Sequence, residues 1–279
     1  MKQRIISAAV GVVLLTIVLI LHNTVVFPLA LAAIIGVILF ELVRAIGGLE
    51  FKLGSVGVIA YGVLMPVIQY VLQNGEHPLL QAISELLMTI CLTLVFWDYM
   101  RHPKTFLVEQ GAFMIASMLL VPNSICILLK LNLYANGLFY VILGLCGAWI
   151  ADSGAYFSGV ALGKKKLCPE ISPKKTVEGF IGGLISNTIL FALIFLIYAK
   201  CNQIEFDILH ALKAGLLGLV CAGISVLGDL TASVIKRQKG IKDYGNIMPG
   251  HGGLMDRFDS VLFVLPAFYF CITLLPIFD

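Results

Sequence analysis

Charged residues are scarce in this sequence. Only 13% of its 279 residues are Asp, Glu, Lys or Arg, whereas 59% are hydrophobic. A water-soluble domain has about 25% charged and roughly 45–50% apolar residues, so this composition excludes an ordinary soluble globule. It also excludes a disordered chain, which needs low hydrophobicity and high net charge. The composition therefore indicates a protein that lies in a membrane.

Paired cysteines are also missing. The seven cysteines are scattered singly, mostly inside apolar runs, with no Cys-x-x-Cys and no Cys/His cluster. This pattern indicates neither a zinc site nor a disulfide framework. We interpret the cysteines as small apolar side chains within membrane helices.

Long uncharged runs, in contrast, recur along the whole chain. A helix of about 20 apolar residues crosses the roughly 30 Å hydrocarbon core of a bilayer, and continuous runs of this length favour helices over barrel strands. The sequence predicts an all-α polytopic membrane protein, a bundle of about nine transmembrane helices with no large soluble domain. The predicted spans lie near 5–22, 25–43, 53–73, 78–97, 108–130, 137–160, 177–199, 208–228 and 258–277.

We interpret residues 1–279 as a single integral-membrane domain. The helices of residues 1–130 are expected to provide scaffold, dimer and lipid contacts, and those of residues 137–279 to carry the active site. The apolar run 5–22 is long for a signal peptide, so we expect it to remain as a first span.

Basic residues are distributed unevenly between the two sides. With a cytoplasmic N-terminus, sixteen of the nineteen Lys and Arg residues fall in the cytoplasmic connections. We expect a multi-pass protein of the cell (plasma or inner) membrane, and because cytoplasmic connections are enriched in Lys and Arg, the bias predicts its orientation. Its N-terminus and active-site loops are expected in the cytoplasm and its C-terminus outside.

Polar residues gather in the segment 225–260. If the eighth span continues to residue 237, one helix face carries a carboxylate, a hydroxyl and two cations. These residues are Asp229, Ser233, Lys236 and Arg237.

A glycine-rich turn, 249–253, precedes two further carboxylates. If a helix begins here, Asp256 and Asp259 lie on one face of it. Together with Asp229, their carboxylate oxygens would form the kind of site that Mg²⁺ prefers. Glycines ahead of a helix let backbone N–H groups approach an anion closely. The cations expected to hold phosphate oxygens are Lys236, Arg237, Lys242 and Arg257.

Simpler interpretations exist for each feature. Asp256 and Asp259 also suit the positive end of a helix dipole, the lysines also suit anionic lipid headgroups, and His251 is a phosphate donor or a turn residue. We favour a functional site because a topology signal needs neither three aspartates nor a His-Gly-Gly run. Ionisable groups within membranes are functional by default.

A second polar segment covers residues 149–183. Asp152 near the end of the sixth span either joins the metal region or makes a hydrogen bond between helices. Gly154, Gly159 and Gly163 permit close helix approach. The loop 164–176 contains five lysines, which either contact a triphosphate or only mark the cytoplasmic side.

Carboxylates for a metal, donors for phosphates and a bounding membrane together indicate phosphoryl or nucleotidyl transfer onto a lipid. Three other acids receive no assignment, and a hydrogen bond between spans is their expected role. They are Glu41, Glu85 and Glu109.

The segment from Ser233 to Asp259 resembles the C-terminal signature of phosphatidate cytidylyltransferases, also called CDP-diacylglycerol synthases. The match has fixed spacing and rests on Ser233, Lys236-Arg237, Lys242-Asp243, Gly245, Pro249, His251-Gly252-Gly253, Asp256-Arg257 and Asp259. Upstream, DSGAYFSGVALGKKKL and ISPKKTVEGFIGG are similar to the family's second conserved stretch.

The resemblance implies a nucleotidyltransferase of phospholipid biosynthesis that converts CTP and phosphatidate to CDP-diacylglycerol and pyrophosphate. It implies Mg²⁺, a monovalent cation such as K⁺ beside it, membrane lipid as surroundings and a homodimer, with no nucleic acid as partner. The expected metal ligands are Asp229, Asp256, Asp259 and Asp152. The expected catalytic residues are Asp229, Asp256, Lys236, Arg237 and Arg257. The expected substrate-binding residues are Ser233, Lys242, His251, Gly252, Gly253, Lys174, Lys175 and Tyr156.

Other activities stay open at this point. A related CTP-dependent polyprenol or phytol kinase would release CDP instead of pyrophosphate, and an ether-lipid cytidylyltransferase would use a different lipid phosphate. An ion-coupled transporter would have broken helices with Asp/Glu pairs at the membrane midplane. Here the charged groups gather toward one face instead, which disfavours a transporter.

Overall fold

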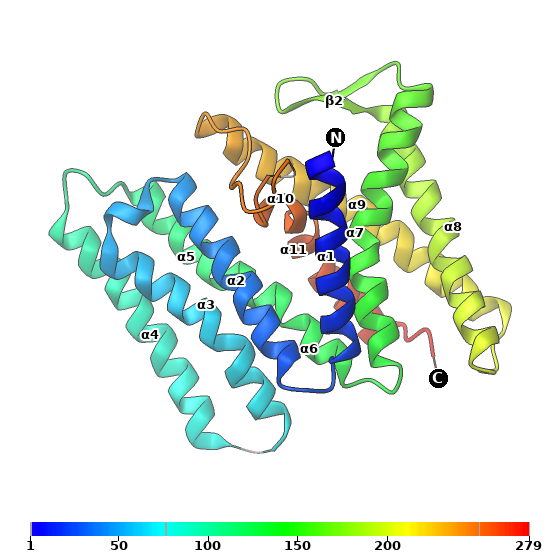
Figure 1. Ribbon diagram of the computed structural model, residues 1–279, viewed down its shortest axis with the longest axis horizontal. Helices are drawn as coiled ribbons and strands as arrows, with labels where there is room; N and C mark the ends of the chain where they lie inside the picture. Colours follow the sequence, from blue (N-terminus) through cyan, green and yellow to red (C-terminus); the bar gives the residue numbers. More distant parts are fainter. Residues whose placement is uncertain (1, 76, 251, 279) are drawn as a thin grey trace. The chain divides into compact units, whose positions relative to one another are not determined.

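The computed structural model describes residues 2–75, 77–250 and 252–278, except the side chains of residues 2–5. Its elements are almost all helices (Figure 1). The first half contains α1 (Lys2–Ile20), α2 (Val26–Ala45), the short η1 (Gly48–Glu50), α3 (Lys52–Gln73), α4 (Pro78–Arg101), α5 (Val108–Ile125) and α6 (Ile127–Asn132). The second half contains α7 (Gly137–Leu162), β1 (Lys166–Cys168), β2 (Ser172–Thr176), α8 (Val177–Cys201), α9 (Ile208–Gln238), α10 (Met255–Phe258) and α11 (Val261–Leu274).

The predicted spans reappear as helices. Among the described residues, eight helical segments are long and apolar enough to cross a membrane, and they coincide with the second to ninth predicted spans. An all-α polytopic membrane protein is therefore confirmed. The first predicted span coincides with α1, whose apolar part, Ile6–Ile20, is shorter than the other eight. That α1 crosses the membrane stays a prediction.

Helix α8 shows how these helices suit lipid. A stripe of apolar side chains recurs every four residues along it and is between 46% and 59% exposed. The stripe consists of Ile181, Ile185, Ile189, Leu193 and Ile197. A continuous apolar stripe is a liability in water, whereas hydrocarbon solvates it without cost. The stripe therefore indicates a lipid-facing surface.

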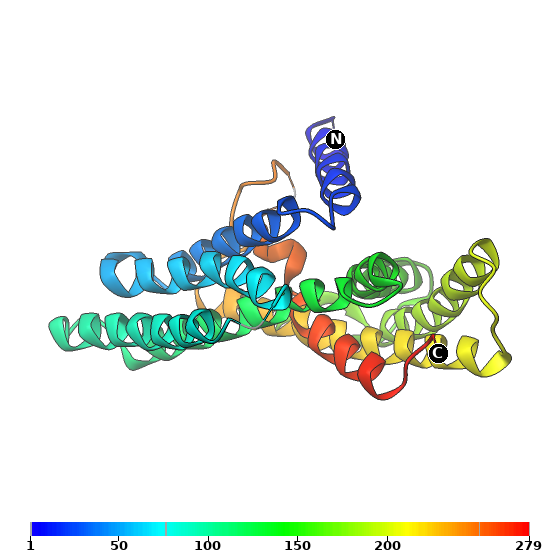
Figure 2. The same ribbon diagram turned by 90° about the horizontal axis from the view of Figure 1, so that it is seen from below.

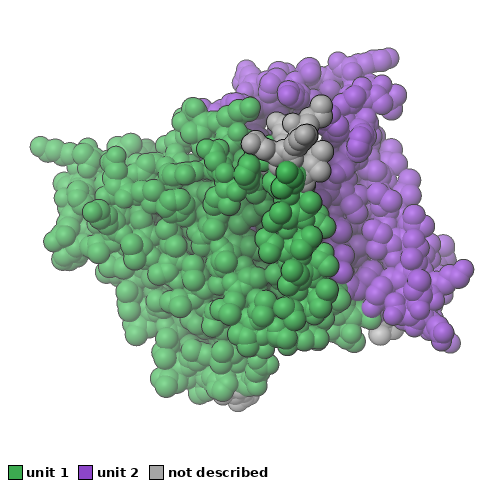
Figure 3. Space-filling view, in the orientation of Figure 1, with its two compact units in different colours: residues 1–138, 238–258 green, residues 139–237, 259–279 purple. Residues whose placement is uncertain are grey.

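The chain divides into two compact units, coloured separately in Figure 3. Unit 1 comprises residues 1–138 and 238–258, and unit 2 comprises residues 139–237 and 259–279. The boundary after residue 138 falls at the start of α7, the first of the C-terminal helices distinguished in the sequence. Residues 238–258, however, group with the N-terminal helices.

Unit 1 is built on the packing of α2 against α3 and of α3 against α4 (Figures 1 and 2). Ile35 and Leu39 of α2 are fully buried and lie against Gly62 of α3, where no larger side chain fits. The buried carboxylate of Asp98 in α4 accepts a hydrogen bond of 2.7 Å from the backbone N–H of Gly54 in α3. This bond satisfies an N–H group at the first turn of α3.

Unit 2 is built on α7, α8 and α9. Asn187 of α8 is fully buried, and its Nδ2 donates to the carbonyl oxygens of Gly147 in α7 (3.2 Å) and Gly218 in α9 (2.8 Å). A Cβ on Gly179 of α8 would lie 3.1 Å from the Cα of Gly159 in α7. The prediction that glycines of the sixth span let helices approach closely is thus confirmed.

Candidate active site

Helix α9 continues well past the apolar run of the eighth span and ends at Gln238. The predicted helix face therefore exists. The Oγ of Ser233 donates a hydrogen bond of 3.3 Å to Oδ1 of Asp229, one helical turn earlier. Lys236 and Arg237 follow in the last turn of the same helix.

The basic loop 164–176 forms a hairpin in the structure. Strands β1 and β2 pair antiparallel, with Lys166 opposite Thr176. Thr176 ends the hairpin and caps α8, because its side-chain oxygen accepts a hydrogen bond of 3.1 Å from the N–H of Gly179. Glu178 accepts from the backbone N–H groups of Lys164 and Lys165, which ties the base of the hairpin to the same helix.

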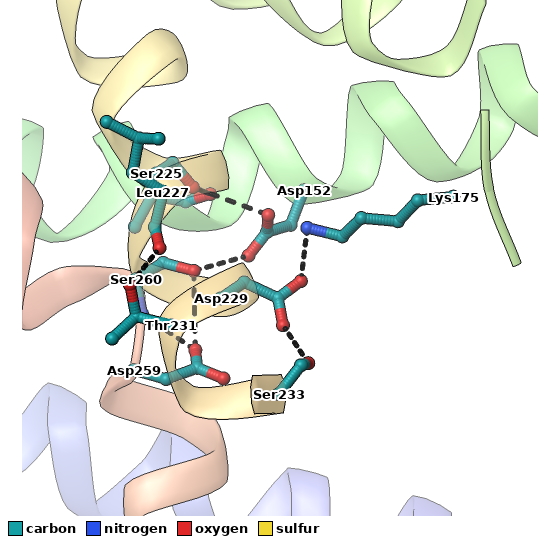
Figure 4. Close-up of polar contacts among 10 residues, drawn as sticks. Asp152, Lys175, Ser225, Leu227, Asp229, Thr231, Ser233, Asp259 and Ser260 are labelled. Atoms are coloured by element: carbon teal, nitrogen blue, oxygen red, sulfur yellow. Dashed lines mark hydrogen bonds and ion pairs between the residues drawn. The ribbon is translucent and has the colours of Figure 1, made fainter. Parts of the chain in front are cut away.

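The hairpin places Lys175 against Asp229 (Figure 4). The Nζ of Lys175 lies 2.5 Å from Oδ2 of Asp229, with the two side chains 22% and 27% exposed. Partial exposure leaves the ion pair within reach of a substrate. Lys174, the residue before Lys175, is exposed to solvent and is not part of this ion pair.

Asp152 belongs to the same group of residues. Its Oδ1 accepts a hydrogen bond of 3.3 Å from Ser225 of α9, and its Oδ2 accepts one of 3.2 Å from Ser260 (Figure 4). The hydrogen bond between helices, one of the two predicted roles, is thus present.

Asp259 lies in the turn between α10 and α11, where its Oδ1 accepts a hydrogen bond of 2.7 Å from the N–H of Ser260. The turn packs closely on α9, since a Cβ on Gly228 would lie 2.7 Å from the carbonyl oxygen of Asp259. The prediction of one helical face shared by Asp256 and Asp259 is wrong, because α10 ends at Phe258. The bond from Asp259 to its neighbour's N–H competes with continued helical pairing.

We call Asp152, Asp229 and Asp259, with Lys175 and the hydroxyls of Ser225, Ser233 and Ser260, the aspartate cluster; all of it belongs to unit 2. Asp229 repels both other carboxylates, and Lys175 and Lys236 offset part of this charge. Three carboxylates and three hydroxyls form an all-oxygen donor set, which suits a hard cation such as Mg²⁺. Within the described part of the chain, no three Asp, Glu, His or Cys side chains are grouped closely enough to hold one metal ion.

The glycine-rich segment belongs to unit 1. We call residues 239–254 the glycine loop. Gly250 and Gly252 have φ of +79° and +85°, conformations that favour glycine, and the N–H of Met248 donates to the carbonyl of Gly252. The predicted turn is therefore present. His251 lies outside the described residues.

The glycine loop lines most of an open cavity of about 640 Å³. Two predicted phosphate-binding cations, Lys242 and Arg257, contribute to its wall. The other lining residues are Asp243, Asn246, Met248, Pro249, Gly250 and Gly252. The cavity thus combines the cations Lys242 and Arg257 with the backbone of Gly250 and Gly252, which carry no side chains.

Asp256 has its own set of contacts in unit 1. Its Oδ2 accepts hydrogen bonds from the N–H of Tyr244 (2.8 Å) and the N–H of Gly253 (2.9 Å). It lies in the first turn of α10, as the simpler interpretation of this residue expected. The carboxylate therefore holds two parts of the glycine loop, at Tyr244 and Gly253, together.

Glu41, for which the sequence predicted only a hydrogen bond between spans, contacts the end of this loop and the start of α10. It is only 1% exposed, and its carboxylate accepts from the N–H groups of Leu254 (3.1 Å) and Met255 (2.7 Å). An acid inside an apolar run is a candidate functional residue, and this feature of the sequence could have pointed to Glu41. The 213 residues that separate it from Leu254 hid the partner.

The remaining predicted residues lie apart from these groups or at their edge. Tyr156 of α7 is 66% exposed beside Phe157. The Nε of Arg237 donates to the carbonyl of Ile171 in the hairpin (3.3 Å), so this cation also holds the hairpin to α9.

Comparison with known proteins places the chain in a family. Residues 2–275 match the family described as "Cytidylyltransferase family". The phosphatidate cytidylyltransferase of Bacillus subtilis (strain 168) is 35% identical over 280 aligned residues, 98% of either chain. Relatives with the same description from Staphylococcus haemolyticus (strain JCSC1435) and Haemophilus influenzae (strain ATCC 51907) are each 46% identical. Their matches cover 47% and 48% of this chain, and 48% and 45% of their own. The chain is therefore a member of the cytidylyltransferase family.

Proposed function

We propose that this protein transfers the cytidylyl group of CTP to phosphatidate, which gives CDP-diacylglycerol and pyrophosphate. The observation that carries the proposal is the 35% identity to the Bacillus subtilis relative over 98% of both chains. A polytopic helical fold that carries a partly exposed pair of a cation and a carboxylate supports a reaction between a lipid and a water-soluble nucleotide.

In the reaction, an oxygen of the phosphatidate phosphate bonds to the α-phosphorus of CTP. The bond from that phosphorus to the bridging oxygen of the β-phosphate breaks, and pyrophosphate leaves with the electron pair. The attacking oxygen already carries negative charge, so no strong general base is needed. Both reactants are polyanions, and the protein's task is to offset their repulsion and align them.

We assign a Mg²⁺ site to the aspartate cluster, with Asp152, Asp229 and Asp259 as the carboxylate ligands. Because these side chains are not grouped closely enough to hold one ion as they stand, binding would have to draw them together. Bound Mg²⁺ would neutralise phosphate charge and stabilise the leaving pyrophosphate. The all-oxygen donor set supports this assignment. The family resemblance adds Asp256 to the ligands and a monovalent cation such as K⁺ beside the divalent one.

We assign phosphate binding to the cavity of the glycine loop. Its volume of about 640 Å³ falls within the range of roughly 300–1,000 Å³ that is usual for small-molecule sites. Lys242 and Arg257 would hold phosphate oxygens, and the backbone around Gly252 lets them approach closely. Ser233, Lys236, His251 and Gly253 remain assigned to the substrates.

We further propose that the N-terminus, the hairpin and the glycine loop face the cytoplasm and that the protein acts as a homodimer in the cell membrane. The distribution of Lys and Arg supports this orientation. The family resemblance supports the dimer.

The test is incubation of the purified protein with CTP labelled at its α-phosphate, phosphatidate and Mg²⁺, followed by separation of lipid and water-soluble products. We expect label in the lipid fraction and release of pyrophosphate, both dependent on phosphatidate and abolished by a chelator. Release of CDP with an unlabelled lipid product would show a lipid kinase and contradict the proposal.

A further inference from the structure

Glu41 lies on α2 of unit 1, far along the chain from the residues assigned to the reaction. Its two carboxylate oxygens accept hydrogen bonds from consecutive backbone N–H groups, Oε1 from Leu254 and Oε2 from Met255. These N–H groups join the end of the glycine loop to α10, so one buried side chain fixes where the loop ends.

The glycine loop is shaped around this carboxylate. A Cβ on Gly253 would lie 2.5 Å from Oε1 and 2.6 Å from Oε2 of Glu41, and a Cβ on Gly245 would collide with the same group. Both glycines are buried, and they approach each other closely, since a Cβ on Gly245 would lie 3.1 Å from the Cα of Gly253. Glycine at these two positions is what lets the two sides of the loop close over Glu41.

Helix α2 holds the other side of the loop as well. Arg44, one turn after Glu41, donates from its guanidinium to the carbonyl oxygen of Tyr244 at 2.5 Å. Tyr244 in turn donates its N–H to Asp256, which also accepts from Gly253. The contacts form a closed chain from α2 through both sides of the loop to Asp256.

We propose that Glu41 is a positioning residue that sets the conformation of the glycine loop and the orientation of Asp256. This inference rests on the proposed cytidylyl transfer. Glu41 acts through backbone groups of the loop and is not itself assigned to a substrate. The N-terminal helices therefore take part in shaping the active site in addition to contacting lipid.

The test compares Glu41→Ala, Glu41→Gln and the wild-type protein, with Glu50→Gln as a matched control. Glu50 is an exposed acid in the short η1 of the same unit. In Glu41→Ala both acceptors are lost, so we expect the KM for CTP to rise about tenfold or more while the KM for phosphatidate changes little. Glu41→Gln keeps one carbonyl acceptor and should recover part of the affinity for CTP.

Hydrogen exchange provides a readout that does not depend on activity. The amides of Leu254 and Met255 should exchange faster in Glu41→Ala than in the wild type, with α3 unchanged. A lower thermal stability with an unchanged KM for CTP and unchanged exchange at these two amides would show a merely structural role. If the wild type and Glu50→Gln both fail to form the labelled lipid, the proposed function is wrong, and hydrogen exchange alone decides the role of Glu41.

Discussion

Lys174 and Lys175 are neighbours in sequence, but their surroundings differ. Both were expected to bind substrate, since a run of lysines does not reveal which side chain turns inward. The structure pairs Lys175 with Asp229, whereas Lys174 is exposed on the hairpin.

This difference gives a matched pair of substitutions. Lys175→Ala removes the ion-pair partner of a half-buried carboxylate, so we expect it to raise the KM for CTP or phosphatidate about tenfold or more. Lys174→Ala should change either KM by less than about twofold, because exposed charges are screened by solvent. Steady-state kinetics gives the KM values of both variants. Equal changes in KM for Lys175→Ala and Lys174→Ala would contradict the different roles of the two lysines.

Asp256 gives a second prediction at this scale. Asp256→Asn removes the charge that attracts the N–H groups of Tyr244 and Gly253. We expect turnover to fall by about 10²–10³-fold, comparable to the loss of one essential electrostatic contact in other enzymes, while the protein elutes from gel filtration like the wild type. Near-normal turnover of Asp256→Asn would contradict a role of Asp256 in the reaction.

Residues whose function depends on local spacing could be predicted from the sequence. Asp229 and Ser233 are one helical turn apart, so extending the helix was enough to pair them. Glu41 could not be placed in this way, because its partners lie more than two hundred residues away. Only the folded backbone shows that it meets the glycine loop.

The same contrast holds for whole elements. Long apolar runs predicted the membrane helices because length and hydropathy alone decide whether a helix suits a bilayer. The hairpin was expected as a loop, because its short lysine-rich strands lack the apolar alternation of a strand. The helix break at Asp259 depends on a side chain that bonds to the neighbouring N–H, a competition that a hydropathy pattern does not record.

Close packing of α7 and α8 can be tested with two glycine substitutions. A Cβ on Gly179 would lie 2.7 Å from the carbonyl oxygen of Ala155, whereas a Cβ on Gly223 of α9 meets nothing within 4 Å. We expect Gly179→Ala to destabilise the protein by about 1–3 kcal/mol and Gly223→Ala to be neutral or slightly stabilising. Thermal unfolding in detergent measures both, and equal midpoints would contradict tight packing at Gly179.

At the scale of the whole molecule, the two ends of α8 test the proposed orientation. The hairpin precedes this helix, and the exposed Cys201 ends it. In intact cells, a membrane-impermeant maleimide should label Cys201 and lose that label in Cys201→Ser. A cysteine introduced by Lys166→Cys should be labelled only after permeabilisation. Labelling of the introduced cysteine in intact cells, with Cys201 labelled only after permeabilisation, would contradict the proposed orientation.

The aspartate cluster and the glycine loop belong to different units, and residues from both are assigned to one reaction. Much of this assignment came from the sequence, because the signature between Ser233 and Asp259 crosses from one unit to the other and back. The support each group receives from its own unit, Lys175 for Asp229 and Glu41 for the loop, required the fold.

We propose that the aspartate cluster holds the divalent cation of the reaction. The most direct measurement is the affinity for Mn²⁺, which accepts the same oxygen ligands as Mg²⁺, followed by electron paramagnetic resonance in the presence of CTP. Asp207→Asn is the matched control, since this exposed aspartate caps α9 and Asn caps equally well. We expect Asp229→Asn to weaken Mn²⁺ binding about tenfold or more, with Asp207→Asn unchanged. A folded Asp229→Asn protein that binds Mn²⁺ like the wild type would contradict the claim.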